Sequence, residues 1–223
     1  MEKYIRIMFI TDSLGCPRKE IEIEHTWVEC IMKEFINDRV MFYTYCQPGL
    51  QVRKLDFGYF EEYKPDILIC QFGIVDAVRR ALTDFENKVV RYLQFDQNLI
   101  RSYLRKNHYN MTKKREIHYT KLELFDSNIS QLIQRMGSNT YFIEIAPAGP
   151  EMVKKVYNIE NDINAYNNCM KKYSNQSVHF LTPYEGQINF LLDDGHHLNS
   201  FGNKLVYQSV KTAITNELQT LTI

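Results

Sequence analysis

The sequence predicts an α/β protein, a three-layer α/β/α sandwich with a central, mostly parallel five-stranded sheet. Three observations lead to this fold class. Strand and helix patterns alternate along the chain. The strand patterns are continuous apolar runs, as at residues 67–72, which is typical of strands that helices cover on both faces. Small and acidic residues follow several of these strands, at the sheet edge where open parallel sheets bind ligands.

Five segments have the composition of buried strands, because they are rich in β-branched and aromatic residues and carry few charges. Each is followed by residues typical of turns or loops; the first, for example, runs into Asp12-Ser13-Leu14-Gly15. The predicted strands are residues 4–11, 40–45, 67–72, 140–146 and 177–182.

Between the strands, apolar residues recur at helical spacing with charged residues between them. In the first such segment, Trp27, Val28 and Ile31 belong to the apolar stripe. The second closes at Lys64-Pro65, because proline disfavours helix at the residue before it. The predicted helices are residues 20–37, 52–63, 122–136, 151–173 and a last helix that begins at Ser200.

Length and composition favour one globular domain over residues 1–223. The hydrophobic fraction of 44% argues against disorder. Lysine plus arginine and aspartate plus glutamate each number 27, so no overall charge attracts nucleic acid or an anionic membrane. No apolar run has the length of a membrane span.

The five cysteines are scattered and contain no Cys-x-x-Cys pair, which disfavours a zinc site or a disulfide framework. We therefore expect reduced thiols, a cytoplasmic protein and no metal or other cofactor. The sequence leaves the oligomeric state open.

A basic segment at about 95–121 interrupts the alternation of strands and helices. Its single acidic residue after position 100 is Glu116, and tyrosines and histidines are interleaved with the basic residues. Two interpretations remain open: a solvated helical insertion, or a lid or docking surface for an anionic substrate or partner. The basic residues are Arg101, Arg105, Lys106, Lys113, Lys114, Arg115 and Lys121.

Residues from the two ends of the chain can form an acid–base–nucleophile set. Asp194 precedes His197 by three residues, and a carboxylate bonded to one imidazole nitrogen leaves the other free to take a proton. Ser13, at the end of the first strand, is the candidate nucleophile. His196 and Asp193 are alternatives one residue away, and each residue by itself could equally be a structural loop residue.

The order and spacing of these segments resemble the SGNH (GDSL-type) hydrolase superfamily over almost the whole chain. Residues 11–15 resemble the first block, with Ser13 as nucleophile, and residues 194–199 resemble the last, Asp-x-x-His followed by Leu-Asn and a glycine. The resemblance implies the flavodoxin-like fold of that superfamily. It also implies that the backbone N–H groups of Ser13 and Gly49 stabilise an oxyanion.

The third block departs from the family pattern. It is usually Gly-x-Asn-Asp, and here it reads Gly73-Ile74-Val75-Asp76, so valine replaces the side chain that donates to the oxyanion. Loss of one such donor costs about 10²–10³ in turnover. We expect Gly73 to line the site and Asp76 to stabilise the turn beside it.

These features predict a serine hydrolase that removes an O-acyl group, such as acetyl, from a carbohydrate or a related small molecule. The same residues could instead transfer the acyl group to a sugar hydroxyl. A third interpretation is a non-catalytic α/β binding module that lost activity at Val75. Metal binding by the paired histidines and aspartates is the least favoured, because adjacent ligands on one loop rarely complete a coordination shell.

Overall fold

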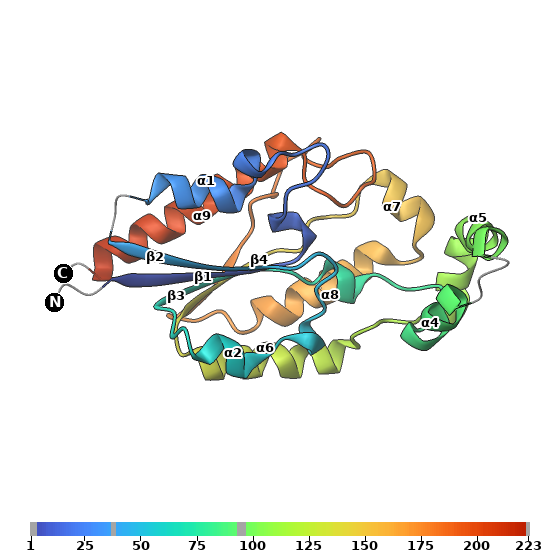
Figure 1. Ribbon diagram of the computed structural model, residues 1–223, viewed down its shortest axis with the longest axis horizontal. Coiled ribbons are helices and arrows are strands. Elements are labelled where there is room, and N and C mark those ends of the chain that lie inside the picture. Colours follow the sequence, from blue (N-terminus) through green and yellow to red (C-terminus); the bar gives the residue numbers. More distant parts are fainter. Residues whose placement is uncertain (1–3, 37–38, 93–96, 222–223) are drawn as a thin grey trace.

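The computed structural model describes residues 4–36, 39–92 and 97–221. Its centre is a sheet of five strands in the order β2-β1-β3-β4-β5, in which all neighbouring strands run parallel (Figure 1). The predicted fold class is therefore confirmed. The strands are β1 (Ile5–Thr11), β2 (Val40–Cys46), β3 (Ile67–Gln71), β4 (Asn139–Ile143) and β5 (Val178–Leu181).

Helices cover both faces of the sheet and bury two separate apolar cores. Alternate side chains of β1 point to opposite faces: Ile7 and Phe9 pack on the α1–α9 side, and Met8 and Ile10 pack on the other. Figure 1 shows these two helical layers above and below the strands. The covering helices are α1 (Trp27–Glu34) and α9 (Ser200–Leu221) on the first face, and α2 (Phe57–Glu61), α6 (Leu122–Met136) and α8 (Ile159–Lys171) on the second.

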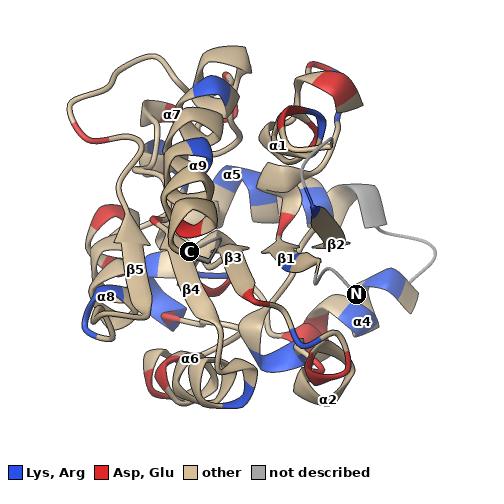
Figure 2. Ribbon diagram, turned by 90° about the vertical axis from the view of Figure 1, so that its left-hand side faces the viewer, with Lys and Arg blue, Asp and Glu red and all other residues tan. Residues whose placement is uncertain are grey.

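Charged residues lie mainly on the helices and loops, whereas the strands carry few of them (Figure 2). Positions of basic and acidic residues are interspersed along the outer helices in that view. Within the described residues, no helix combines the length and apolar character needed to cross a lipid bilayer.

Three predicted helices are shorter or divided, because local capping interrupts the helical periodicity. In the range 20–37, Thr26 accepts the Glu29 N–H and starts α1 only at Trp27; position 37 lies outside the described residues. In the range 52–63, Asp56 caps α2 after a separate 3₁₀ turn. In the range 151–173, the left-handed backbone of Asn158 (φ 62°) separates α7 (Pro150–Lys155) from α8.

Three further helices lie between β3 and α6. They are the short α3 (Ile74–Ala77), α4 (Asp84–Tyr92) and α5 (Gln97–Arg115). Helix α5 carries most of the basic segment predicted over 95–121, of which positions 95 and 96 lie outside the described residues. Figure 1 shows α4 and α5 extending beyond the end of the sheet, next to α7.

The start of α9 requires glycine at position 202, because the backbone at Phe190 packs closely against it. A Cβ atom at Gly202 would lie 2.3 Å from the carbonyl oxygen of Phe190. That oxygen accepts the N–H of Asn199, two residues after His197. We expect Gly202→Ala to destabilise the protein by about 1–3 kcal/mol, the usual cost of overpacking.

Thermal unfolding measures this effect. Gly58→Ala is the matched control, because Gly58 is exposed on α2 and its added Cβ would meet only Asp56 Oδ1 at 3.4 Å. Equal melting temperatures for the two variants would contradict the packing argument.

Candidate active site

Ser13 lies in a tight 3₁₀ turn at the carboxyl end of β1. Asp12 caps this turn, and its Oδ1 accepts the N–H of Leu14 at 2.9 Å. A Cβ atom at Gly15 would lie 2.3 Å from Oγ1 of Thr11, so the turn requires glycine there. These contacts fix the Ser13 hydroxyl at the edge of the sheet where ligands bind in parallel α/β folds.

The loop before α9 brings an imidazole and a carboxylate to Ser13. Ser13 Oγ lies 3.1 Å from Nε2 of His197, although 184 residues separate them in the sequence. The other ring nitrogen, Nδ1, lies 2.6 Å from Oδ2 of Asp194. The structure therefore joins the three predicted residues in one hydrogen-bonded chain. Their catalytic roles remain predictions.

The neighbouring residues His196 and Asp193 make different contacts from His197 and Asp194. The His196 ring lies against that of His197, tilted by 40° with ring centroids 3.9 Å apart, and its Nδ1 faces the backbone carbonyl of Asp194 at 3.4 Å. Asp193 is exposed. Asp194, His196 and His197 also place potential metal-ligand atoms within 4.8 Å of one another. However, the Asp194–His197 hydrogen bond already uses one atom from each residue.

Burial and hydrogen bonding set the charges of this chain of residues. Partial burial acts to raise the pKa of Asp194, but hydrogen bonds from the His197 ring and from the N–H groups of His196 and His197 hold that pKa well below its usual range. Burial lowers the pKa of His197, and this outweighs the opposing effect of Asp194. The imidazole is therefore mostly neutral at pH 7 and able to accept a proton.

Asp12 is a second carboxyl group beside Ser13, and it serves the turn. It is fully buried, and burial raises its pKa to about 7. Its Oδ2 has no hydrogen-bond partner within the described residues. The capping bond to Leu14 uses only Oδ1.

Of the residues expected on the oxyanion side, Gly49 borders the same cavity as Ser13. Gly49 has a left-handed backbone (φ 74°) in the turn after β2, where an added Cβ would meet nothing within 4 Å. It lines the cavity, so its backbone is open to a ligand. Val75, which stands where the family has asparagine, lines the cavity as well.

Gly73 and Asp76 do not border this cavity in the described structure. Gly73 (φ 116°) is buried at the start of α3, where a Cβ would lie 2.7 Å from Ile145 Cδ1. Asp76 is buried too, and its carboxylate accepts the N–H of Val52 at 3.2 Å. Gly73 is thus needed for backbone shape, and Asp76 holds the chain segment that follows Gly49.

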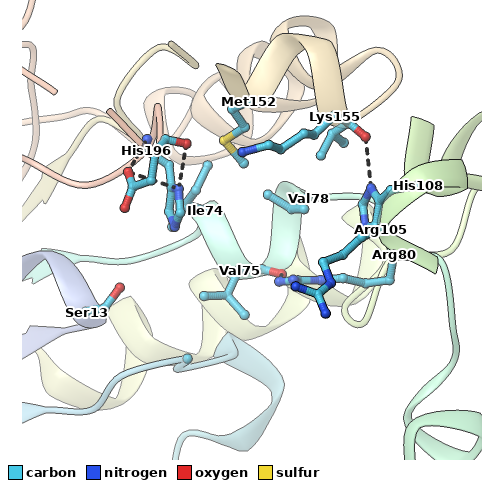
Figure 3. Close-up of a pocket in the computed structure, with 13 residues that line it drawn as sticks. Ser13, Ile74, Val75, Val78, Arg80, Arg105, His108, Met152, Lys155 and His196 are labelled. Atoms are coloured by element: carbon cyan, nitrogen blue, oxygen red, sulfur yellow. Dashed lines mark hydrogen bonds and ion pairs between the residues drawn. The ribbon is translucent and has the colours of Figure 1, made fainter. Parts of the chain in front are cut away.

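The cavity has a volume of about 560 Å³, within the range typical of small-molecule sites. Figure 3 shows Ser13 on one side and the side chains of Arg80 and Arg105 on the other, with Val75 between them, whereas the Lys155 side chain extends to Met152 on the facing wall. Arg80, Met152 and Lys155 line the cavity but were not among the residues that the sequence motifs predicted. All three follow strands β3 and β4, and this common position at the sheet edge is the signal that could have found them.

Comparison with known proteins agrees with the geometry at the level of the fold. No family model and no curated protein matches the chain. Among solved structures, it resembles a lipase/acylhydrolase from Enterococcus faecalis (14% identity, 96% of each chain, TM-score 0.63). It also resembles a carbohydrate esterase family 3 protein from Talaromyces cellulolyticus (13% identity, 97% of this chain and 99% of that one, TM-score 0.59).

A third similar structure is a member of the lipolytic G-D-S-L family from Veillonella parvula (10% identity, 95% of this chain and 98% of that one, TM-score 0.59). The chain therefore has the fold of the SGNH (GDSL-type) hydrolases, as the sequence motifs predicted. At these sequence identities the similarity establishes the fold alone. The reaction has to be inferred from the residues of the site.

The His197 environment predicts how the reactivity of Ser13 varies with pH. Labelling of Ser13 by a fluorophosphonate should speed up as His197 loses its proton, with a midpoint below the ordinary histidine value of 6.5. Asp194→Asn should slow labelling by about 10⁴-fold, because the imidazole loses its orienting carboxylate. A labelling rate that stays constant from acid to neutral pH, or that Asp194→Asn leaves unchanged, would contradict this account.

Proposed function

We propose that this protein is a serine esterase that removes an O-acyl group, such as acetyl, from a carbohydrate or a related small molecule. The observation that carries the proposal is the continuous hydrogen-bonded chain from Ser13 through His197 to Asp194. Its nucleophile borders a cavity large enough for a small ester. Nucleophile, base and orienting carboxylate in this arrangement are the parts that acyl transfer through a serine requires.

Each atom in this chain has a defined role in the proposed reaction. Ser13 Oγ attacks the acyl carbonyl carbon and gives its proton to His197 Nε2. The tetrahedral intermediate collapses as the C–O bond to the alcohol breaks, and the departing oxygen takes the proton from His197. Water then attacks the acyl-serine with His197 again as base, and this releases the acid and restores Ser13.

The remaining groups stabilise charge during these steps. Asp194 stays ionised and holds the imidazolium that forms when His197 accepts the proton. The open backbone of Gly49, together with the N–H of Ser13, is assigned to the oxyanion. The neutral imidazole that burial maintains is the form able to begin the reaction.

The proteins with similar structures support an ester substrate. They include a lipase/acylhydrolase and a carbohydrate esterase. Transfer of the acyl group to a sugar hydroxyl would use the same acyl-serine, and the products of the assay below distinguish it from hydrolysis.

The direct test is hydrolysis of p-nitrophenyl acetate and of acetylated sugars by the protein and by Ser13→Ala. Turnover should fall at least about 10³-fold in the variant, because the nucleophile is lost. Ser127→Ala, an exposed serine on α6, should behave as the unchanged protein does. Equal rates for the protein and Ser13→Ala, with no fluorophosphonate labelling, would instead indicate a binding module.

Replacing Val75 by asparagine, the residue that the superfamily pattern has at this position, should increase ester hydrolysis. Val75→Asn should raise kcat for p-nitrophenyl acetate by about tenfold or more, since one oxyanion donor contributes 10²–10³ in turnover elsewhere. Val75→Ala, which opens similar space without a donor, should show no such gain. A rate that does not rise in Val75→Asn would mean that another group already fills this role.

A further inference from the structure

Three basic side chains line the cavity that contains Ser13: Arg80, Arg105 and Lys155. In the described part of the chain, none of them lies within 4.0 Å of a carboxylate oxygen. Arg80 Nη2 donates to the carbonyl of Val75 at 3.0 Å, and its buried Nε has no hydrogen-bond partner among the described residues. Arg105 donates to the carbonyl of Arg101 at 3.3 Å.

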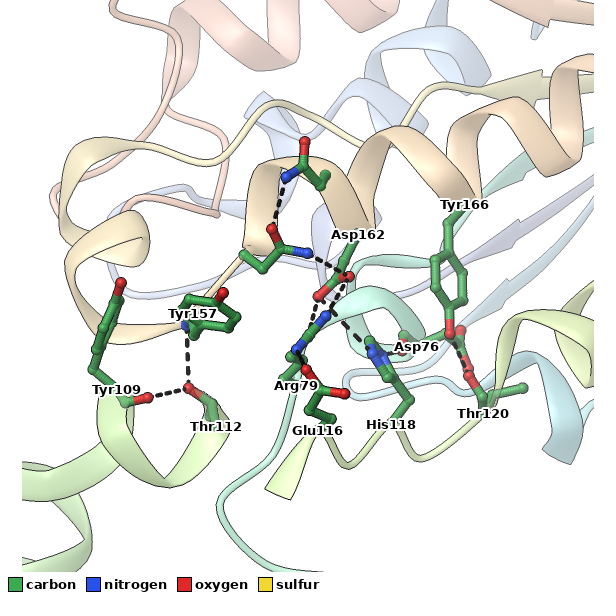
Figure 4. Close-up of polar contacts among 12 residues, drawn as sticks. Asp76, Arg79, Tyr109, Thr112, Glu116, His118, Thr120, Tyr157, Asp162 and Tyr166 are labelled. Carbon is green, nitrogen blue, oxygen red and sulfur yellow. Dashed lines mark hydrogen bonds and ion pairs between the residues drawn. The ribbon is translucent and has the colours of Figure 1, made fainter. Parts of the chain in front are cut away.

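Two arginines of the same region are instead held in ion pairs. Arg79 bonds Asp162 and Glu116, each at 2.7 Å (Figure 4). Arg115 bonds Glu86 at 2.7 Å. The fold thus pairs Arg79 and Arg115 directly with carboxylates, whereas Arg80 lies over the Tyr119 ring at 5.0 Å and interacts with Asp76 and Asp84 only at longer range.

The helix that supplies Arg105 is tied to the body of the protein at two points that follow this residue. One turn further along, His108 Nδ1 lies 2.8 Å from the carbonyl of Lys155, which links α5 to α7 (Figure 3). At the end of α5, Oγ1 of Thr112 accepts the N–H of Tyr157 at 3.1 Å (Figure 4). Arg105 therefore lies in the cavity wall because α5 is held there, and its position needs no closing motion.

The cations are separated from the nucleophile by apolar side chains. Figure 3 shows Val75 and Val78 between Ser13 and the two arginines, and Lys155 extends along Met152 on the facing wall. A ligand that filled this space would meet polar groups at both ends and methyl groups between them. An anion beside the arginines would give them a charge-assisted hydrogen-bond partner, which no carboxylate of the described residues provides.

We propose that Arg105, Arg80 and Lys155 bind a carboxylate or phosphate of the substrate, so that the natural substrate is an acylated acidic sugar. This inference rests on the proposed esterase function, which supplies the ester bond of the substrate. It adds that the sugar carrying this ester is negatively charged. Within the basic segment on α5, Arg105 is then the residue that contacts the ligand. The basic residues at 113–115 lie outside the cavity lining.

The test compares acetate release from three O-acetylated sugars: methyl glucoside, glucuronic acid and glucose 6-phosphate. The ratio of kcat/KM for an acidic sugar to that for the neutral sugar should exceed one. In Arg105→Gln it should fall by about tenfold, the value of one charge-assisted hydrogen bond, and further when Lys155→Gln is added. Whichever acid shows the larger ratio identifies carboxylate or phosphate as the bound group.

Arg101→Gln is the matched control, because Arg101 is exposed on the same helix outside the cavity lining and should leave the ratio unchanged. Raising the salt concentration should lower the ratio in the unchanged protein. A neutral sugar preferred over both acids, or equal ratios in the protein and in Arg105→Gln, would overturn the proposal while leaving the esterase function standing.

If no sugar ester is cleaved, a binding experiment tests the anion site independently of the esterase function. Calorimetry then measures the affinity of the protein for glucuronate, glucose 6-phosphate and glucose, which carry no ester. Binding of one of the acids that Arg105→Gln loses and Arg101→Gln keeps would support the anion site without hydrolysis. Absence of binding by both acids would overturn it.

Discussion

The packing of α9 against the sheet is the constraint on which the site depends, because it sets His197 beside Ser13. Two buried hydrogen bonds link α9 to the sheet through Trp27 of α1: the Trp27 N–H donates to Asn203 Oδ1 of α9 at 3.1 Å, and the Trp27 indole donates to Gln71 Oε1 of β3 at 2.6 Å. Breaking such buried bonds leaves unsatisfied polar groups, so the core enforces the alignment. The 3.1 Å contact between Ser13 and His197 is thus a property of the folded domain as a whole.

Electrostatics divide the site in a chain whose formal net charge is zero. Among the described lining residues, Asp194 is the one carboxylate, and its charge is committed to His197. Arg80, Arg105 and Lys155 have no carboxylate of the described residues within 4.0 Å. This excess of positive charge along a partly apolar cavity favours negative charge on a bound ligand.

The sequence predicted what local patterns and motif order can encode. Apolar runs located the strands, and the turn after β1 and the Asp-x-x-His loop pointed to Ser13, Asp194 and His197. Periodicity could not show where Asp56 or Asn158 divides a helix, because a single cap or left-handed residue overrides it. Gly73 was expected in the site but packs under Ile145, and Arg80 and Lys155 were missed because their orientation depends on how distant helices meet.

The two walls of the cavity are attached to the catalytic loop in different ways. At Gly195, whose φ is 79°, the backbone accepts the N–H of Gly149 at 2.7 Å, and a Cβ there would lie 2.9 Å from the backbone nitrogen of Met152. Helix α7 is therefore in main-chain contact with the loop that carries His197, so a backbone shift of α7 would also move His197. Helix α5 meets that body through side chains such as His108, which leaves it the freer element for diversifying what the cavity accepts.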